Sequence, residues 1–278
     1  LAEAGAPGAD PGEWAGLRPA STDAPLVERE GMRVSPSSID GFRECAVQWA
    51  IGALDPGRSS MAAAFGTIVH EAVEHADGTD ADALLAAIES RWSELGFPSA
   101  WESQRQREVA QEIARTLASY FRAERDAGWT IEAADHERRF ELEVGDVTLR
   151  GSIDWIERRG DEVRIVDLKT GKTKPTGQQI AEHSQLRAYQ LAVARGAIQT
   201  LPEGVRSAGA RLLHPRASQP KAEQAPLDEA QLAEFEALVL DVAERMAAAA
   251  FATVPTQHCH DQYAPRGCDI HVRKQVTE

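Results

Sequence analysis

The chain has 278 residues, of which 30 are basic and 44 acidic, so its formal net charge is −14. A hydrophobic fraction of 42% is ordinary for a globular core, which excludes disorder along the whole chain and a polycationic nucleic-acid-binding arm. The sequence contains no apolar stretch of roughly 18 residues and no signal-like N-terminal segment. These features predict a cytoplasmic protein with no membrane partner.

Residues 1–33 are rich in Pro, Gly, Ala and acidic residues and show no apolar period, which predicts a linker or a surface arm. The chain opens at Leu1 rather than Met, so we expect it to be a piece of a longer polypeptide. The folded domain is expected over residues 34–278.

Residues 34–128 are predicted to be helical. Ser35 followed by Pro36 is an N-cap with proline at the first helical position, and it predicts a helix to about Leu54. Apolar residues at helical spacing predict further helices over residues 65–75, 84–95 and 109–121.

After Trp129 the apolar residues recur at every second position, which predicts a sheet core over residues 129–215. Alternating segments 140–144, 147–155 and 163–168, separated by glycine-containing turns, predict a three-stranded meander. A helix over 178–197 and a strand over 208–213 follow, and a long amphipathic helix over 227–246 opens the C-terminal part, 226–278. The predicted fold class is α/β (α+β), with a mixed central sheet flanked by helices.

Three charged residues mark the ends of two neighbouring strands. Asp167 and Lys169 are two residues apart on a strand and therefore share a face, while Asp154 interrupts the apolar end of the preceding strand. A hairpin brings Asp154 to Asp167 only if the strand register permits it. Paired carboxylates with room for water are the ligands that Mg²⁺ requires, and a lysine beside them can orient the water or neutralise charge on a phosphate.

Gln185 and Tyr189 are four residues apart on the predicted crossing helix, so they lie on one face of it. Each of these features alone has a plainer explanation. An aspartate and a lysine spaced like Asp167 and Lys169 more often form a surface ion pair, and a single aspartate such as Asp154 is commonly an acidic residue of a turn. Their joint occurrence in this order favours a catalytic site.

The segments Gly151 to Asp154, Ile165 to Gly171 and Gln185 to Tyr189 together resemble the RecB-like branch of the PD-(D/E)xK nuclease superfamily. Phe65 to His70 resembles the helical Gly-x-x-x-His element of that family, and Ser35 to Cys45 its opening helix. The likeness spans residues 35–274. It is closest to the nuclease module at the C-terminus of AddB or actinobacterial AdnA/AdnB helicase–nuclease subunits.

The resemblance implies a restriction-endonuclease-like fold and a set of site residues. It assigns Mg²⁺ or Mn²⁺ to Asp154, Asp167, the backbone carbonyl of Leu168 and His70. It also makes Lys169 the catalytic lysine, and it gives Gln185 and Tyr189 orienting roles near the lysine and the DNA.

In iron–sulfur members of the family, one cysteine lies in the first helix and three lie near the C-terminus. Cys45, Cys259 and Cys268 fit that pattern, but Gln262 stands where the fourth cysteine is expected. A cluster held by four thiolates therefore cannot form from this chain. Either a histidine such as His258 or His260 completes the site, or the cluster has been lost; we favour an incomplete or lost cluster.

The segment from Arg138 to Lys174 holds nearly equal numbers of basic and acidic residues, so no basic stripe is evident. Because phosphate neutralisation supplies most non-specific affinity for DNA, we expect a fused or associated helicase to deliver the strand, which is expected to be single-stranded. The predicted function is hydrolysis of DNA phosphodiester bonds in end processing and recombinational repair. The alternatives are a non-catalytic DNA-channel or interaction domain with the same fold, and a free-standing CRISPR-adaptation-type exonuclease.

Overall fold

The computed structural model describes residues 27–54, 61–76 and 78–251 and a few isolated positions before Val27, with the side chains at 54 and 132–138 excepted. No helix in these ranges is long and apolar enough to cross a membrane.

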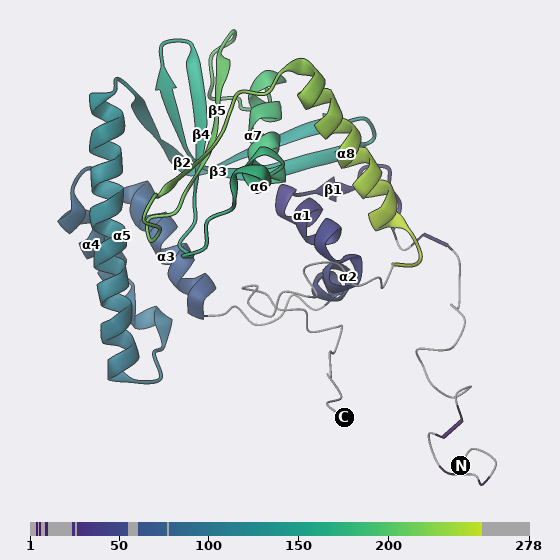
Figure 1. Ribbon diagram of the computed structural model, residues 1–278, viewed down its shortest axis with the longest axis horizontal. Helices are drawn as coiled ribbons and strands as arrows, with labels where there is room; N and C mark the ends of the chain where they lie inside the picture. Colours follow the sequence, from purple (N-terminus) through teal and green to yellow (C-terminus); the bar gives the residue numbers. More distant parts are fainter. Residues whose placement is uncertain are drawn as a thin grey trace.

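The centre of the molecule is a six-stranded mixed sheet in the order β1-β3-β4-β5-β6, with β2 paired to β3 (Figure 1). The strands are β1 (Arg33–Val34), β2 (Thr130–Val144), β3 (Val147–Arg159), β4 (Glu162–Leu168), β5 (Arg206–Leu213) and β6 (Lys221–Gln224). The β1–β3 and β4–β5 pairs are parallel and the other pairs antiparallel. The sheet therefore contains the predicted meander, which is β2, β3 and β4.

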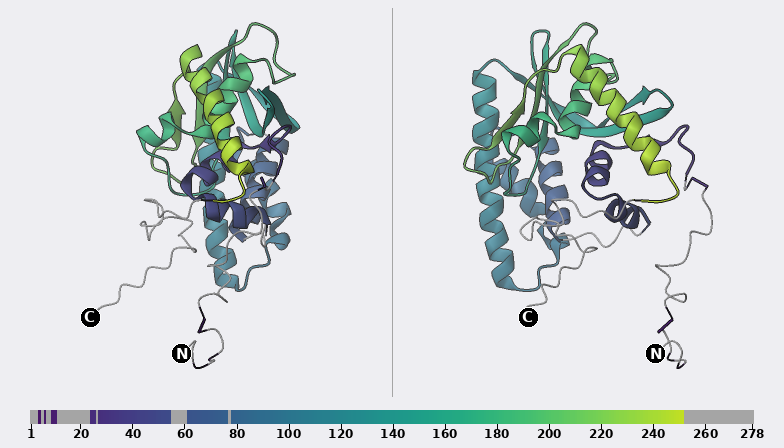
Figure 2. Two further views of the ribbon diagram at one scale, coloured as in Figure 1. Left: turned by 90° about the vertical axis from the view of Figure 1, so that its right-hand side faces the viewer. Right: turned by 45° about the vertical axis from the view of Figure 1, so that its right-hand side comes forward.

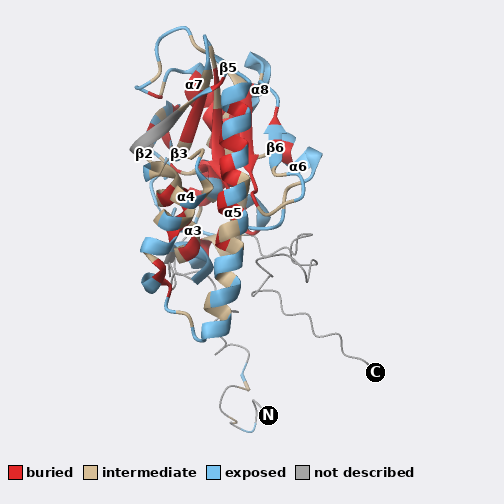
Figure 3. Ribbon diagram, turned by 90° about the vertical axis from the view of Figure 1, so that its left-hand side faces the viewer, coloured by how far each residue is buried: buried red, intermediate tan, exposed pale blue. Residues whose placement is uncertain are grey.

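Helices cover both faces of the sheet, and the two further views in Figure 2 show the same separation. The helices are α1 (Pro36–Glu44), α2 (Ala46–Leu54), α3 (Met61–His75), α4 (Ala81–Ser90), a 3₁₀ turn η3 (Trp92–Leu95), α5 (Ala100–Asp126), α6 (Gly177–Ala181), α7 (Ser184–Ala194) and α8 (Glu229–Ala247). One apolar core joins the sheet to α1, α7 and α8, and a second joins it to α3, α4 and α5. In Figure 3 the buried residues are concentrated in the sheet, and the outer face of α5 is exposed. The molecule is thus a mixed sheet between two helical layers, as predicted.

Two glycines make the tight turns of the meander. Gly145 and Gly160 have φ angles of 60° and 62°, a left-handed conformation that side chains with a Cβ rarely adopt. These turns set the register of β3 against β2 and β4, which decides where Asp154 lies.

Three predicted helices are each broken once. The helix predicted over 84–95 ends as α4 at Ser90, and η3 follows after Arg91. The helix predicted from Ser35 to Leu54 is interrupted at Cys45, whose backbone is extended with φ −158°. The break turns the chain so that Phe42 and Trp49 pack edge to face, with ring centroids 5.2 Å apart. The helix predicted over 178–197 is likewise divided into α6 and α7, separated by residues 182–183.

A buried ionic network fastens α5 to the sheet. Glu124 of α5 accepts hydrogen bonds from Arg164 at 2.6 Å and from Arg211 at 2.9 Å. Glu157 of β3 is fully buried, pairs with Arg164 and accepts a hydrogen bond from Tyr120. Because removing one partner would leave a buried charge uncompensated, the network holds α5 in one position on the sheet.

Candidate active site

The ends of β3 and β4 bring the two predicted aspartates together. Trp155 lies opposite Val166 in the antiparallel register, so the next step of the hairpin places Asp154 beside Asp167. Asp154 Oδ2 accepts a hydrogen bond of 2.6 Å from the backbone N–H of Leu168. The register that the sequence left open therefore takes the arrangement in which the acids converge.

Asp167 is the buried carboxylate of the pair, with only 4% of its surface exposed. Its Oδ1 accepts a hydrogen bond of 2.6 Å from Gln185 Nε2, and its Oδ2 lies 2.7 Å from Lys169 Nζ. The lysine contact is a close ion pair without hydrogen-bond alignment. Burial raises the pKa of Asp167, Lys169 lowers it and the charge of Asp154 raises it again, so that the net shift is upward.

Gln185 links the lysine to the buried acid. Its Oε1 accepts a hydrogen bond of 2.9 Å from Lys169 Nζ, while its Nε2 donates to Asp167 and, at 2.7 Å, to the hydroxyl of Tyr189. One amide thus fixes Lys169 and Asp167 at the same time. The orienting role of Gln185 stays a prediction, with which these contacts agree.

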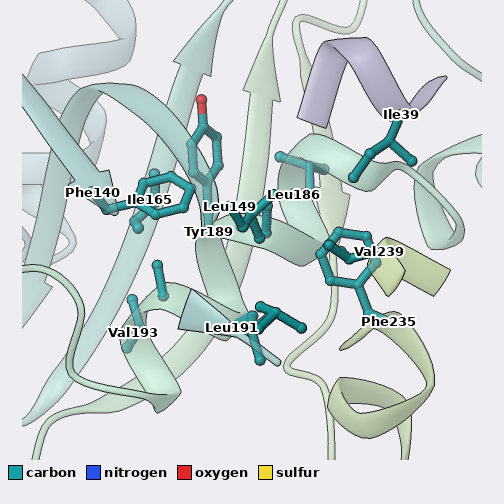
Figure 4. Close-up of a cluster of buried hydrophobic side chains, with 14 of the residues drawn as sticks. Ile39, Phe140, Leu149, Ile165, Leu186, Tyr189, Leu191, Val193, Phe235 and Val239 are labelled. Carbon is teal, nitrogen blue, oxygen red and sulfur yellow. The ribbon is translucent and has the colours of Figure 1, made fainter. Parts of the chain in front are cut away.

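Tyr189 reaches the site from the apolar core. Its ring packs beside Phe140, with centroids 6.2 Å apart, and Figure 4 shows its hydroxyl pointing out of the cluster. The hydroxyl lies 2.8 Å from Asp167 Oδ1 and 2.9 Å from the carbonyl oxygen of Ser152. Since the hydroxyl carries one proton, it donates to one of these two acceptors at a time.

His70 approaches Asp154 from α3, on the other side of the sheet end. Its Nδ1 lies 2.9 Å from Asp154 Oδ1. Burial lowers the pKa of His70, but the hydrogen bond and charge of Asp154 outweigh burial, so the net shift is upward.

Helix α3 also runs close to the loop that follows Lys169. Gly66 lies one turn before His70 on this helix, and a Cβ added at Gly66 would meet Thr170 Oγ1 at 3.4 Å.

A cavity of about 500 Å³ opens between α3 and the ends of β3 and β4. His70, Ser152, Asp154 and Leu168 line it together with residues of α3. The cavity is large enough for an ion, water and part of a substrate. His70, Asp154 and Leu168 thus line one cavity. Asp167, which neighbours Asp154, and Lys169, which pairs with Asp167, lie next to this cavity.

The donor types around this cavity fit a hard divalent cation. Two carboxylates whose charges repel, an imidazole and a backbone carbonyl are the ligands that Mg²⁺ or Mn²⁺ accepts. Over the described ranges, however, no three His, Cys, Asp or Glu side chains are grouped so that they could hold a metal as they stand. Asp154 is turned toward Leu168 N and His70, so a cation would bind with rotation of that carboxylate.

The cysteine site is only partly described. Cys45 is buried and lies between α1 and α2, where its Sγ accepts a hydrogen bond of 3.4 Å from Gln48 N. Cys259, Cys268 and Gln262 lie outside the described residues. The incomplete cluster therefore stays a prediction.

Two contributors to the site were not singled out from the sequence. The carbonyl oxygen of Ser152 anchors Tyr189, and the backbone N–H of Leu168 binds Asp154. Both are backbone groups, so no residue type marks them.

One comparison with known proteins gives a match. The family model described as the PD-(D/E)XK nuclease superfamily matches residues 33–272. No curated protein matches the chain. The mixed sheet with flanking helices is the restriction-endonuclease-like fold that the sequence predicted.

Proposed function

The chain belongs to the PD-(D/E)XK nuclease superfamily, and from this we propose that it is a metal-dependent DNA nuclease domain that hydrolyses phosphodiester bonds. The observation that carries the proposal is the convergence of Asp154, which lines the cavity, with Asp167 and Lys169, which adjoin it. A carboxylate pair can hold a divalent cation, and an ammonium group beside it can stabilise the charge that builds on a phosphodiester.

Asp154, Asp167, His70 and the carbonyl of Leu168 would hold Mg²⁺ or Mn²⁺. When bound, the ion supplies a Lewis acid and lowers the pKa of a bound water. Lys169 then orients the attacking water or neutralises the charge that builds on the phosphate. Gln185 keeps the ammonium of Lys169 within reach of this position, and Tyr189 keeps Asp167 in its buried orientation.

The substrate that we propose is a single strand of DNA delivered by a helicase, in end processing and repair. The net charge of −14 supports delivery by another component, because an acidic chain attracts DNA weakly on its own. The intact set of Asp154, Asp167, Lys169 and Gln185 argues against a non-catalytic scaffold, since a scaffold has no need of a buried carboxylate that is held by two hydrogen bonds and an ion pair.

A nuclease assay with single-stranded and duplex DNA in Mg²⁺, Mn²⁺ or EDTA tests the proposal. We expect cleavage with either metal, none in EDTA, and a loss of at least about 10²-fold in rate for Asp167→Asn and Lys169→Ala. Lys172→Ala is the matched control, because Lys172 is an exposed lysine on the following loop. Cleavage by Asp167→Asn at the parental rate would refute the proposal.

A further inference from the structure

We infer that Arg139 and Arg150 form a phosphate track, which continues the catalytic cleft along β3 and holds the phosphates that neighbour the scissile one. The inference rests on the proposed nuclease function and specifies how the strand is held. No part of the catalytic chemistry described above uses either arginine.

The strand register places both arginines on one face of the β2–β3 hairpin, next to the catalytic cavity. Arg150 and Ser152 are two residues apart on β3, so their side chains leave the same face of the strand. Arg139 of β2 lies directly opposite Ser152. Because opposed residues of an antiparallel pair share a face, Arg139 joins the row formed by Arg150 and Ser152, and Ser152 lines the same cavity as Asp154.

The cavities of the structure follow this row. A cavity of about 420 Å³ is lined by Arg139, Arg150 and Ser152, with Ser35, Phe140, Glu141 and Gly151. Ser152 also lines the catalytic cavity that contains Asp154 and His70. One residue therefore joins the two hollows, and a strand leaving the catalytic cleft at Ser152 enters the arginine-lined cavity next.

The spacing along β3 matches a polymer with regularly placed charges. Strands rise about 3.3–3.4 Å per residue, so Ser152, with Arg139 opposite it, lies about 7 Å from Asp154, and Arg150 lies about 13 Å from it. Each step of two residues is of the order of the distance between neighbouring phosphates in an extended strand. We therefore assign the first flanking phosphate to Arg139 and the second to Arg150.

The charge of this cavity favours an anion although the chain as a whole is acidic. Among the described residues that line it, two carry a guanidinium group and one, Glu141, carries a carboxylate. Arg139 and Arg150 are both exposed, and no described residue forms an ion pair with Arg150 within 4.0 Å. Guanidinium forks bind phosphate oxygens in pairs, and contacts to phosphate carry no sequence information, so the track holds DNA of any sequence.

Binding of a fluorescein-labelled oligothymidylate, followed by anisotropy in EDTA, tests the track with the whole chain. We expect Arg139→Gln and Arg150→Gln each to weaken binding about 3- to 10-fold, and each to reduce the slope of log affinity against log salt by about 0.7. Arg206→Gln is the control, because Arg206 is an exposed arginine that pairs with Asp161 at the opposite end of the sheet. Wild-type affinity and slope in both site variants, or no binding by the wild-type chain at low salt, would overturn the inference.

A second measurement places each arginine. Oligonucleotides with one uncharged methylphosphonate linkage, at one or two positions from the cleaved bond, should be cut more slowly by the wild-type chain. Arg150→Gln should show no added penalty at the second position, and Arg139→Gln none at the first. Equal penalties in all three proteins would contradict the assignment. Because binding is measured without metal, arginine-dependent binding by a chain that never cleaves DNA would refute the nuclease function and leave the track in place.

Discussion

The hydroxyl of Tyr189 lies 2.8 Å from Asp167 Oδ1 and joins the apolar core to the buried acid of the site. The Tyr189 ring is fully buried, so its position is fixed by packing rather than by solvent. Burial first, and then the negative charge of Asp167, raises the pKa of Tyr189 well above its ordinary value. The hydroxyl therefore stays protonated and acts as a donor throughout the working pH range.

Tyr189→Phe tests this relationship. We expect a loss of about 1–2 kcal/mol in the free energy of unfolding, because Ser152 and Asp167 compete for a donor that is no longer present. We also expect kcat to fall about 10-fold with little change in KM, since Tyr189 is fully buried. Tyr120→Phe is the matched control, because Tyr120 is an equally buried tyrosine that hydrogen-bonds Glu157 away from the site. The relationship is not supported if both variants retain kcat.

Gln185→Leu removes the amide that joins Lys169 to Asp167. We expect kcat to fall by about 10²-fold or more, with the pH–rate profile displaced, because the lysine loses its acceptor and the aspartate a donor. Gln190→Leu, at a buried glutamine on the same helix that donates to Gln224, separates a folding defect from a catalytic one. An unchanged pH–rate profile in Gln185→Leu would contradict the linking role.

Gly151→Ala should disturb Tyr189 from a distance. A Cβ at position 151 would lie 2.6 Å from the Phe140 ring, and that ring packs on Tyr189. We expect about 1–3 kcal/mol of destabilisation and reduced cleavage, measured by urea unfolding and by the nuclease assay. The double variant Gly151→Ala with Phe140→Leu should recover part of the lost stability and part of the lost cleavage, because a smaller side chain at position 140 relieves the clash. If the double variant is as unstable and as slow as Gly151→Ala, the effect does not pass through the Phe140 ring.

The elements that set the site were predictable because their signals are local. Alternation and two glycine turns predicted the meander, and the spacing of Asp167 and Lys169 predicted that they share a face; the register then proved to be the one in which Asp154 converges with them. The short strands β1 and β6 were not predicted, since two and four residues carry too little periodicity.

Long-range charge pairing could not be deduced in the same way. Glu124 and Arg211 are 87 residues apart, and nothing in the sequence around either predicts that they meet under α5. The near neutrality of residues 138–174 likewise gave no indication of a basic surface. Only the hairpin register shows that Arg139 and Arg150 lie on one face of the β2–β3 pair.

Metal binding should be visible as a gain in stability. A ligand that binds only the folded chain stabilises it by about 2.7 kcal/mol at a hundredfold excess over Kd, so Mg²⁺ or Mn²⁺ should raise Tm relative to EDTA. Asp154→Asn should abolish this gain, because a carboxamide is a weaker ligand for a hard cation. Asp241→Asn, at an exposed carboxylate on α8, should retain it. A gain of the same size in Asp154→Asn would remove that carboxylate from the ligand set.

The buried network predicts how stability falls in acid. Burial alone would raise the pKa of Glu124, but Lys221, Arg211 and Arg164 outweigh burial and lower that pKa to about 2, against an ordinary value of 4.5. Because the folded pKa is the lower one, the network stabilises the fold above about pH 4.5, and this contribution, at most on the order of 3 kcal/mol, is lost as the pH falls toward 2. Urea unfolding of Glu124→Gln from pH 7 to 3 should show a lower free energy of unfolding at pH 7 and a shallower fall in acid. Glu112→Gln, at an exposed glutamate of the same helix, should follow the parent, and a Glu124→Gln curve parallel to the parent would contradict the pairing.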